Sequence, residues 1–72
     1  MNDCTLKDGL AANVIALRHT LARAVVDATT ACKDLANGNN RAAVGAVIPI
    51  AQALKDAEAL YAAVLILNRE LN

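Results

Sequence analysis

The sequence predicts an all-α protein, an antiparallel helical hairpin of two long helices that pairs with a second copy to form a four-helix bundle. Three observations predict this fold. Apolar residues recur at alternating steps of three and four along both halves of the 72-residue chain, as in helices that pack on other helices. The only clear turn signal, Asn37-Gly38-Asn39-Asn40, separates the two halves. The chain also carries more apolar helix surface than one hairpin can bury.

The first helix is expected over about residues 5–36. Thr5 can accept a hydrogen bond from an early backbone N–H, and Asp8 would place a negative charge in the first turn. Since Gly9 weakens that turn, we expect a start anywhere from Asn2 to Gly9. A heptad seam follows, and its middle is made of alanines that permit close helix approach: Leu10, Val14, Leu17, Leu21, Ala24, Ala28, Ala31 and Leu35.

The second helix is expected over about residues 41–71, after a turn at residues 37–40. Gly38 can adopt the left-handed conformation that ends a helix, and Asn39 or Asn40 can cap the next one. Two nearly equal arms and a short connection favour one hairpin domain over residues 1–72. The seam of this arm again alternates steps of four and three: Ala43, Val47, Ile50, Leu54, Ala57, Tyr61, Val64, Asn68 and Leu71.

Pro49 is the one interruption of the second arm. Its ring removes a ladder N–H and collides with the carbonyl of Gly45. We expect one helix kinked at Pro49, because Ile48 is a poor N-cap for a separate third helix. A three-helix arrangement is the alternative.

Association is expected because the apolar residues of the second arm also lie off its seam, most densely from Leu60 to Leu67. One partner helix cannot cover both stripes, and a soluble monomer rarely exposes such a patch. Two cysteines and one histidine are too few for a structural zinc site. We therefore predict a homodimer or a larger oligomer, with these residues at the oligomer or partner interface: Leu60, Tyr61, Val64, Leu65, Leu67 and Leu71.

Composition excludes several classes of protein. Seven Lys and Arg balance seven Asp and Glu, and 57% of the residues are hydrophobic, so the chain is neither disordered nor strongly basic. Its apolar runs are shorter than the roughly 20 residues of a membrane span. The first residues lack the basic and apolar regions of a secretory signal, so a cytoplasmic location is expected.

No catalytic constellation, cofactor motif or metal-ligand set is present, so we predict a protein that is not an enzyme and binds no cofactor. Cys4 and Cys32 lie four heptads apart, about 42 Å along one helix at about 1.5 Å per residue, which is too far for an intrachain disulfide. Cys32 is expected to be a small buried hydrophobe and Cys4 a free thiol. A Cys4 to Cys32 bridge between antiparallel subunits is the alternative.

Three residues could form a polar binding face: Arg18, His19 and Arg23. Such a basic strip can contact RNA phosphates, but we favour a solvated helix face, because no aromatic side chain is available to stack on bases. Asn68 occupies a seam position where a polar side chain can fix register, or it lies in a wet last turn. Tyr61 is either an anchor for a partner or a filler of space between alanines.

The sequence thus favours a small non-enzymatic protein–protein interaction module, a homo-oligomeric adaptor, inhibitor or regulator that presents helix faces to a protein partner. Small regulators of phages and mobile elements are often helical and of this length. In shape alone the predicted hairpin dimer resembles the Rop family of plasmid copy-control proteins, without a shared residue motif, and this implies the alternative of an RNA-binding hairpin dimer. A sponge for small ligands at subunit junctions is the third hypothesis.

Overall fold

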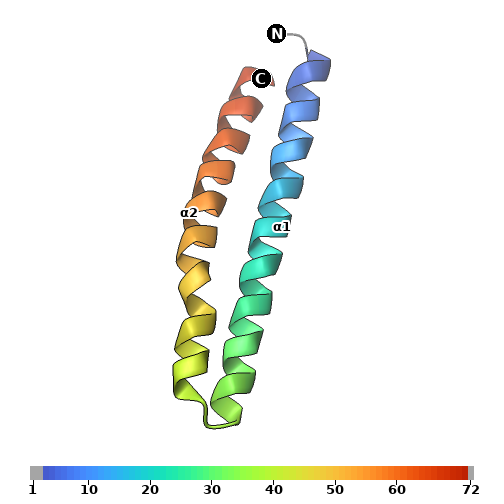
Figure 1. Cartoon of the computed structure of the whole chain (residues 1–72). Helices are drawn as coiled ribbons and strands as arrows, with labels where there is room; N and C mark the ends of the chain where they lie inside the picture. The colour runs from blue at the N-terminus through green and yellow to red at the C-terminus, as the bar shows by residue number, and fades with distance from the viewer. Residues whose placement is uncertain (1–2, 72) are drawn as a thin grey trace.

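The computed structural model describes residues 3–71 and contains two α-helices that lie side by side in opposite directions (Figure 1). Helix α1 spans Asp3–Ala36 and helix α2 spans Asn40–Leu71. The hairpin is a slender rod of 54 × 14 × 13 Å, with both chain ends at the end opposite the turn. The prediction of an all-α hairpin with two long helices is confirmed. Neither helix is long and apolar enough to cross a membrane.

Helix α1 is already formed at Asp3, two residues before the predicted cap at Thr5. Thr5 therefore lies within the first turn of the helix. Asp3 places its carboxylate near the positive end of the helix dipole, and Lys33 places its ammonium group in the last turn, where the dipole is negative. Both charges therefore interact favourably with the dipole of α1 and stabilise this helix.

The connection between the helices is a Schellman turn followed directly by an N-cap. Gly38 has a φ angle of 75°, so it occupies the left-handed region that was expected for it. The amide of Asn39 donates to the carbonyl of Asp34 at 2.8 Å, and the amide of Gly38 donates to that of Leu35 at 3.0 Å. The side-chain oxygen of Asn39 then accepts from the amide of Ala42 at 3.2 Å, which caps α2.

Two glycine substitutions should therefore act in opposite directions. Replacing Gly38 by Ala forces a side chain into the left-handed region, so we expect a loss of about 1 kcal/mol of unfolding free energy. Gly45 lies inside α2 with open space around its Cα, so Gly45→Ala should gain about 1 kcal/mol from helix propensity. Urea unfolding followed by circular dichroism measures both, and equal shifts of the two variants would contradict this account of the turn.

Helix α2 continues through Pro49 as one helix, so the arrangement with three helices is not adopted. Pro49 and Gly45, whose carbonyl the proline ring crowds, are both exposed. A backbone carbonyl that loses its helical partner can bond to water at such a position. Exposure therefore makes the proline tolerable in the middle of this helix.

The two helices meet along rows of residues that repeat every seven positions. In α1 these inner rows contain two sets: Leu10, Leu17, Ala24 and Ala31, and Leu6, Asn13, Thr20, Asp27 and Asp34. In α2 they contain Ala43, Ile50, Ala57, Val64 and Leu71, and Ala46, Ala53, Leu60 and Leu67. Every one of these residues is buried or half-buried. The inner rows therefore form most of the interface within the hairpin.

The core made by these rows is thin. Among residues 3–71, only four hydrophobic residues are buried: Leu6, Ala31, Ala43 and Ala57. The accessible surface is 5315 Å², whereas a compact monomer of 7.5 kDa would expose about 4,200 Å². The radius of gyration is 16.5 Å against about 11 Å for a compact chain of this length. The hairpin by itself thus leaves much more surface in water than a globular protein does.

Candidate interaction face

Each helix exposes a row of apolar residues, most of them large, directly beside its inner rows. In α1 this row contains Val14, Leu21, Ala28 and Leu35, and in α2 it contains Val47, Leu54 and Tyr61. Each residue follows an inner-row residue by four positions, so it lies about 40° further around the helix. Leu21 is 44% exposed, Leu54 57% and Tyr61 56%. These residues belong to the heptad seams of the sequence, but the partner helix of the hairpin does not cover them.

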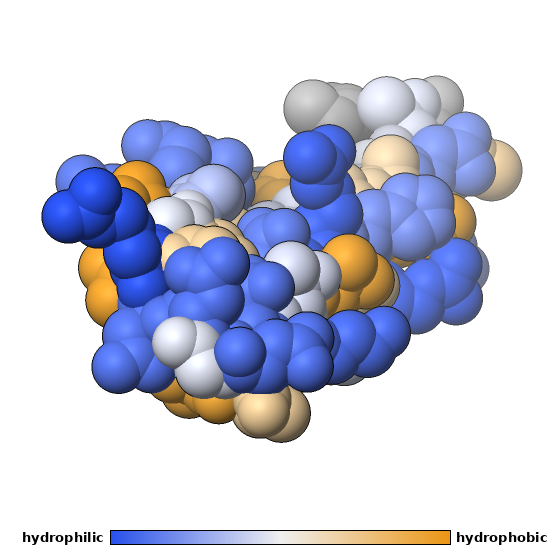
Figure 2. All heavy atoms as spheres, turned by 60° about the horizontal axis from the view of Figure 1, so that its bottom comes forward, coloured by the Kyte–Doolittle hydropathy of each residue, from blue (hydrophilic) through white to orange (hydrophobic). Residues whose placement is uncertain are grey.

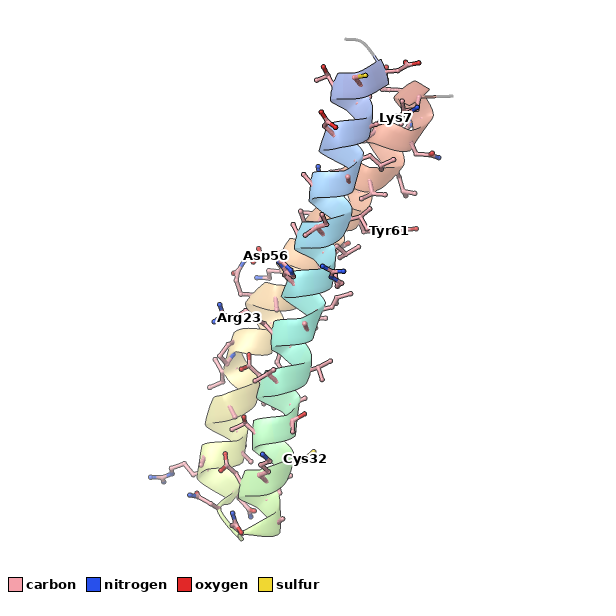
Figure 3. The ribbon with its side chains drawn as sticks, turned by 90° about the vertical axis from the view of Figure 1, so that its right-hand side faces the viewer. Lys7, Arg23, Cys32, Asp56 and Tyr61 are labelled. Carbon is pink, nitrogen blue, oxygen red and sulfur yellow. The ribbon has the colours of Figure 1, made fainter. Side chains whose placement is uncertain are left out.

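The two exposed rows emerge on the same broad side of the hairpin. Both helices are right-handed and they run in opposite directions, so rows that follow the inner rows by the same step appear on the same side. Figure 3 shows this directly: Tyr61 of α2 and Cys32 of α1 project from one side of the molecule, while Arg23 of α1 and Asp56 of α2 project from the other. We call the side of Tyr61 and Cys32 the apolar face.

The apolar face contains most of the exposed hydrophobic bulk. Nine of the 13 large hydrophobic residues that are exposed in the described chain belong to it, which makes the surface strongly asymmetric: Val14, Leu21, Val25, Leu35, Val44, Val47, Leu54, Tyr61 and Leu65. Figure 2, which views the molecule with its turn end forward, shows hydrophilic side chains gathered over that end and hydrophobic ones emerging at its sides. The apolar face therefore runs along the helices, beside a polar turn.

The opposite side of the hairpin is more polar, and so is one of its inner rows. Asp56 accepts a hydrogen bond from Gln52 at 2.9 Å on the same helix. The half-buried row Asn13, Thr20, Asp27 and Asp34 lies at the edge of the interface away from the apolar face, and Asn13 donates its amide to the carbonyl of Gly9 at 2.8 Å. In α1, polar residues thus occupy most of the inner row that is farther from the apolar face.

The predicted interface residues divide into two groups in the structure. Leu60, Val64, Leu67 and Leu71 lie on the inner rows and are half-buried against α1. A Cβ atom placed on Gly9 would lie 3.7 Å from Cδ1 of Leu67, an ordinary van der Waals distance, so Leu67 lies directly beside Gly9. Tyr61 and Leu65 are exposed on the apolar face. One side of the apolar run from Leu60 to Leu67 therefore packs against α1, and its other side is exposed on the apolar face.

The three residues of the predicted polar binding face do not share one side. Arg23 projects from the side opposite Tyr61 (Figure 3). Arg18 precedes Val25 by seven residues and so shares its row on the apolar face, and His19 lies one residue, or 100°, further around. All three are exposed. His19 and Arg23 are one turn apart and lie next to each other, whereas Arg18 lies on the apolar face.

Cys4 and Cys32 are both exposed free thiols. The expectation that Cys32 is a buried hydrophobe is wrong for the hairpin, because its row faces away from α2. Cys32 follows Val25 by seven residues and therefore belongs to the apolar face. In the part of the chain that the structure describes, no three His, Cys, Asp or Glu side chains gather where they could hold a metal ion.

Sequence reasoning missed the division of each seam between two surfaces. In α1 alternate seam residues enter the hairpin, as Leu10 and Leu17 do, while Val14 and Leu21 face outward. The signal was present in the polar row Asn13, Thr20, Asp27 and Asp34, which occupies the place of a second apolar row. A helix that packed on one partner only would bury apolar residues in both inner rows.

No protein-family model matches the chain, and the comparisons with curated proteins and with solved structures gave no match.

Proposed function

We propose that this chain is a small, non-enzymatic protein–protein interaction module that works as an adaptor or inhibitor in regulation. Its apolar face covers another protein, and the first protein that it covers is a second copy of itself, in a homodimeric four-helix bundle. The single observation that carries this proposal is the gathering of nine large exposed hydrophobic residues on one side of the hairpin. An exposed patch of this kind marks an interaction site in a soluble protein.

The direction of the heptad seams supports the four-helix bundle. In a bundle of two hairpins, each helix points its core residues between two neighbours, one in its own chain and one in the other. The inner row of Leu17 faces the first neighbour, and the adjacent row of Leu21 would face the second. The seams on which these two rows alternate are the most regular apolar pattern in the sequence. The polar row of Asn13 would then lie at the outer edge of the bundle, where water can reach it.

The surface area supports the same assembly. The chain exposes about 1,100 Å² more than a compact protein of its mass, from 5315 Å² against about 4,200 Å². A stable interface of standard size buries about 800 Å² on each partner. The excess is therefore large enough for one such interface. Apolar area of this size provides the driving force for association.

A kink at Pro49 belongs to this proposal. Pro49 lies on the side opposite the apolar face, in the same row as Asp56 seven residues later. The ring of a proline inside a helix crowds the preceding turn, so the helix bends away from the side on which the proline lies. Such a bend would curve α2 toward the second hairpin and keep the apolar face in contact along its length.

Thermal unfolding at several protein concentrations tests the proposal. If folding and dimer formation are coupled, mass action raises the midpoint temperature when the concentration is raised, and about a hundredfold change should shift it by several degrees. The measurement is the circular dichroism signal of the helices against temperature. A midpoint that stays constant over that range would contradict self-association as the main use of the apolar face.

A further inference from the structure

Two charged side chains lie halfway along the apolar face, one at each of its long edges. Arg18 lies in the row of Val25 on α1, and Glu58 lies in the row of Leu65 on α2, because each is seven residues from the residue named with it. Both are exposed, and within residues 3–71 neither makes an ion pair. Lys7 lies apart from them, at the open end of the hairpin (Figure 3). An apolar face that carries one cation and one anion halfway along its length requires an explanation.

The two charges stand at the same height along the hairpin. In two antiparallel helices, residues at the same height have numbers with a constant sum, because one helix ascends as the other descends. Gly9 packs beside Leu67, so this sum is 76. The numbers 18 and 58 also sum to 76, so Arg18 and Glu58 lie at the same height on different helices. The row of Arg18 and the row of Glu58 both point away from the interface between α1 and α2, so the two side chains lie apart, across the width of the face. One hairpin therefore presents a positive charge on one helix and a negative charge at the same height on the other.

We infer that the occupant of the apolar face is a second copy of this chain with its turn at the same end, related by a two-fold axis parallel to the helices. This inference rests on the proposed function and adds the subunit orientation to it. In this arrangement α1 of each copy lies against α2 of the other, antiparallel and at equal height. Arg18 then faces Glu58 of the second copy, and Glu58 faces its Arg18. Both charges of each chain gain a partner at the edge of the new interface.

The opposite orientation, with the turns at opposite ends, fits poorly. With the two hairpins level, α1 would lie against α1 and α2 against α2. Arg18 is close to the middle of Asp3–Ala36, so it would meet Arg18 of the second copy, and Glu58 would meet Glu58. Like charges that face each other destabilise an interface. A shift by one heptad would separate them, but it would leave both charges without partners and shorten the overlap of the hairpins.

A distance between two labels tests the orientation. The variant Cys4→Ser, Cys32→Ala, Arg41→Cys carries one thiol beside the turn, and a nitroxide label on it allows pulsed electron paramagnetic resonance between the two copies. Turns at the same end place the labels less than about 35 Å apart, within the width of a four-helix bundle. Turns at opposite ends place them nearly as far apart as the 54 Å length of the rod.

The possible outcomes separate the inference from the proposed function. A short distance supports the orientation inferred. A distance near the length of the rod overturns the orientation and leaves self-association standing. A single-chain mass together with no dipolar coupling between labels overturns both.

A charge-reversal cycle tests the paired residues independently of the labels. Arg18→Glu and Glu58→Arg should each raise the dimer dissociation constant by about tenfold, because two attractive pairs become repulsive in each dimer. The double variant should return to within about threefold of the unchanged protein. Arg23→Glu, the same change on the opposite face, serves as the matched control and should shift the constant less than about twofold. A double variant no tighter than the single ones would overturn the pairing of Arg18 with Glu58.

Discussion

Leu21→Asp is expected to abolish self-association. Leu21 lies in the middle of the apolar face, 44% exposed in the hairpin and facing the second copy in the proposed bundle. A carboxylate buried there without a partner costs about 3 kcal/mol or more, and each dimer would contain two. We therefore expect the dissociation constant to rise by more than about a thousandfold. Sedimentation velocity over a range of concentrations measures this directly.

Ile15→Asp is the matched control for Leu21→Asp. Ile15 lies on the same helix, is 47% exposed, and occupies a row that points away from both α2 and the apolar face. The same loss of a large apolar side chain and the same new charge should change stability there by about 0.5 kcal/mol or less. If Ile15→Asp weakened association as much as Leu21→Asp, the apolar face would not be the surface that the second copy covers.

Leu60→Asp combined with Leu67→Asp is expected to unfold the protein at any concentration. Both leucines lie on an inner row of α2, and Leu67 packs beside Gly9 of α1. Two unpaired charges in this interface together cost more than the free energy of unfolding that a domain of this size commonly has. The expected result is loss of the helical circular dichroism signal and a single-chain mass.

The control for the double variant keeps its spacing and charge but changes the row. Ala59→Asp with Ile66→Asp places two carboxylates seven residues apart on exposed positions of α2, one residue before each leucine. This variant should keep most of its helicity. Retention of both mass and helicity by Leu60→Asp with Leu67→Asp would contradict the placement of these leucines inside the hairpin.

The fold could be predicted from the sequence because its signals are local. Gly38 and Asn39 define a turn whose geometry depends on backbone conformation and one side-chain cap, and both act there as expected. The alternation of steps of three and four fixes which residues share a side of each helix. The sequence leaves the first residue of α1 open, since Asp3 and Thr5 are both acceptable residues for a first turn.

The interaction face could not be placed from the sequence with the same accuracy. A heptad seam shows that a helix is covered, but it does not show which neighbour covers which row. Leu17 and Leu21 look equivalent in the sequence, yet one faces α2 and the other faces outward. Arg18 and Glu58 lie at the same height only because the turn folds α2 back along α1, so that residues whose numbers sum to about 76 become level. That relation depends on tertiary geometry and has no local signature.

The most direct test of the central claim is the molar mass in solution, measured by light scattering over a wide range of concentrations together with circular dichroism on the same samples. We predict a helical species of twice the 7.5 kDa chain mass that persists on dilution and loses helicity when it finally dissociates. A helical species with the mass of one chain at every concentration would contradict the claim that the apolar face is covered by a second copy.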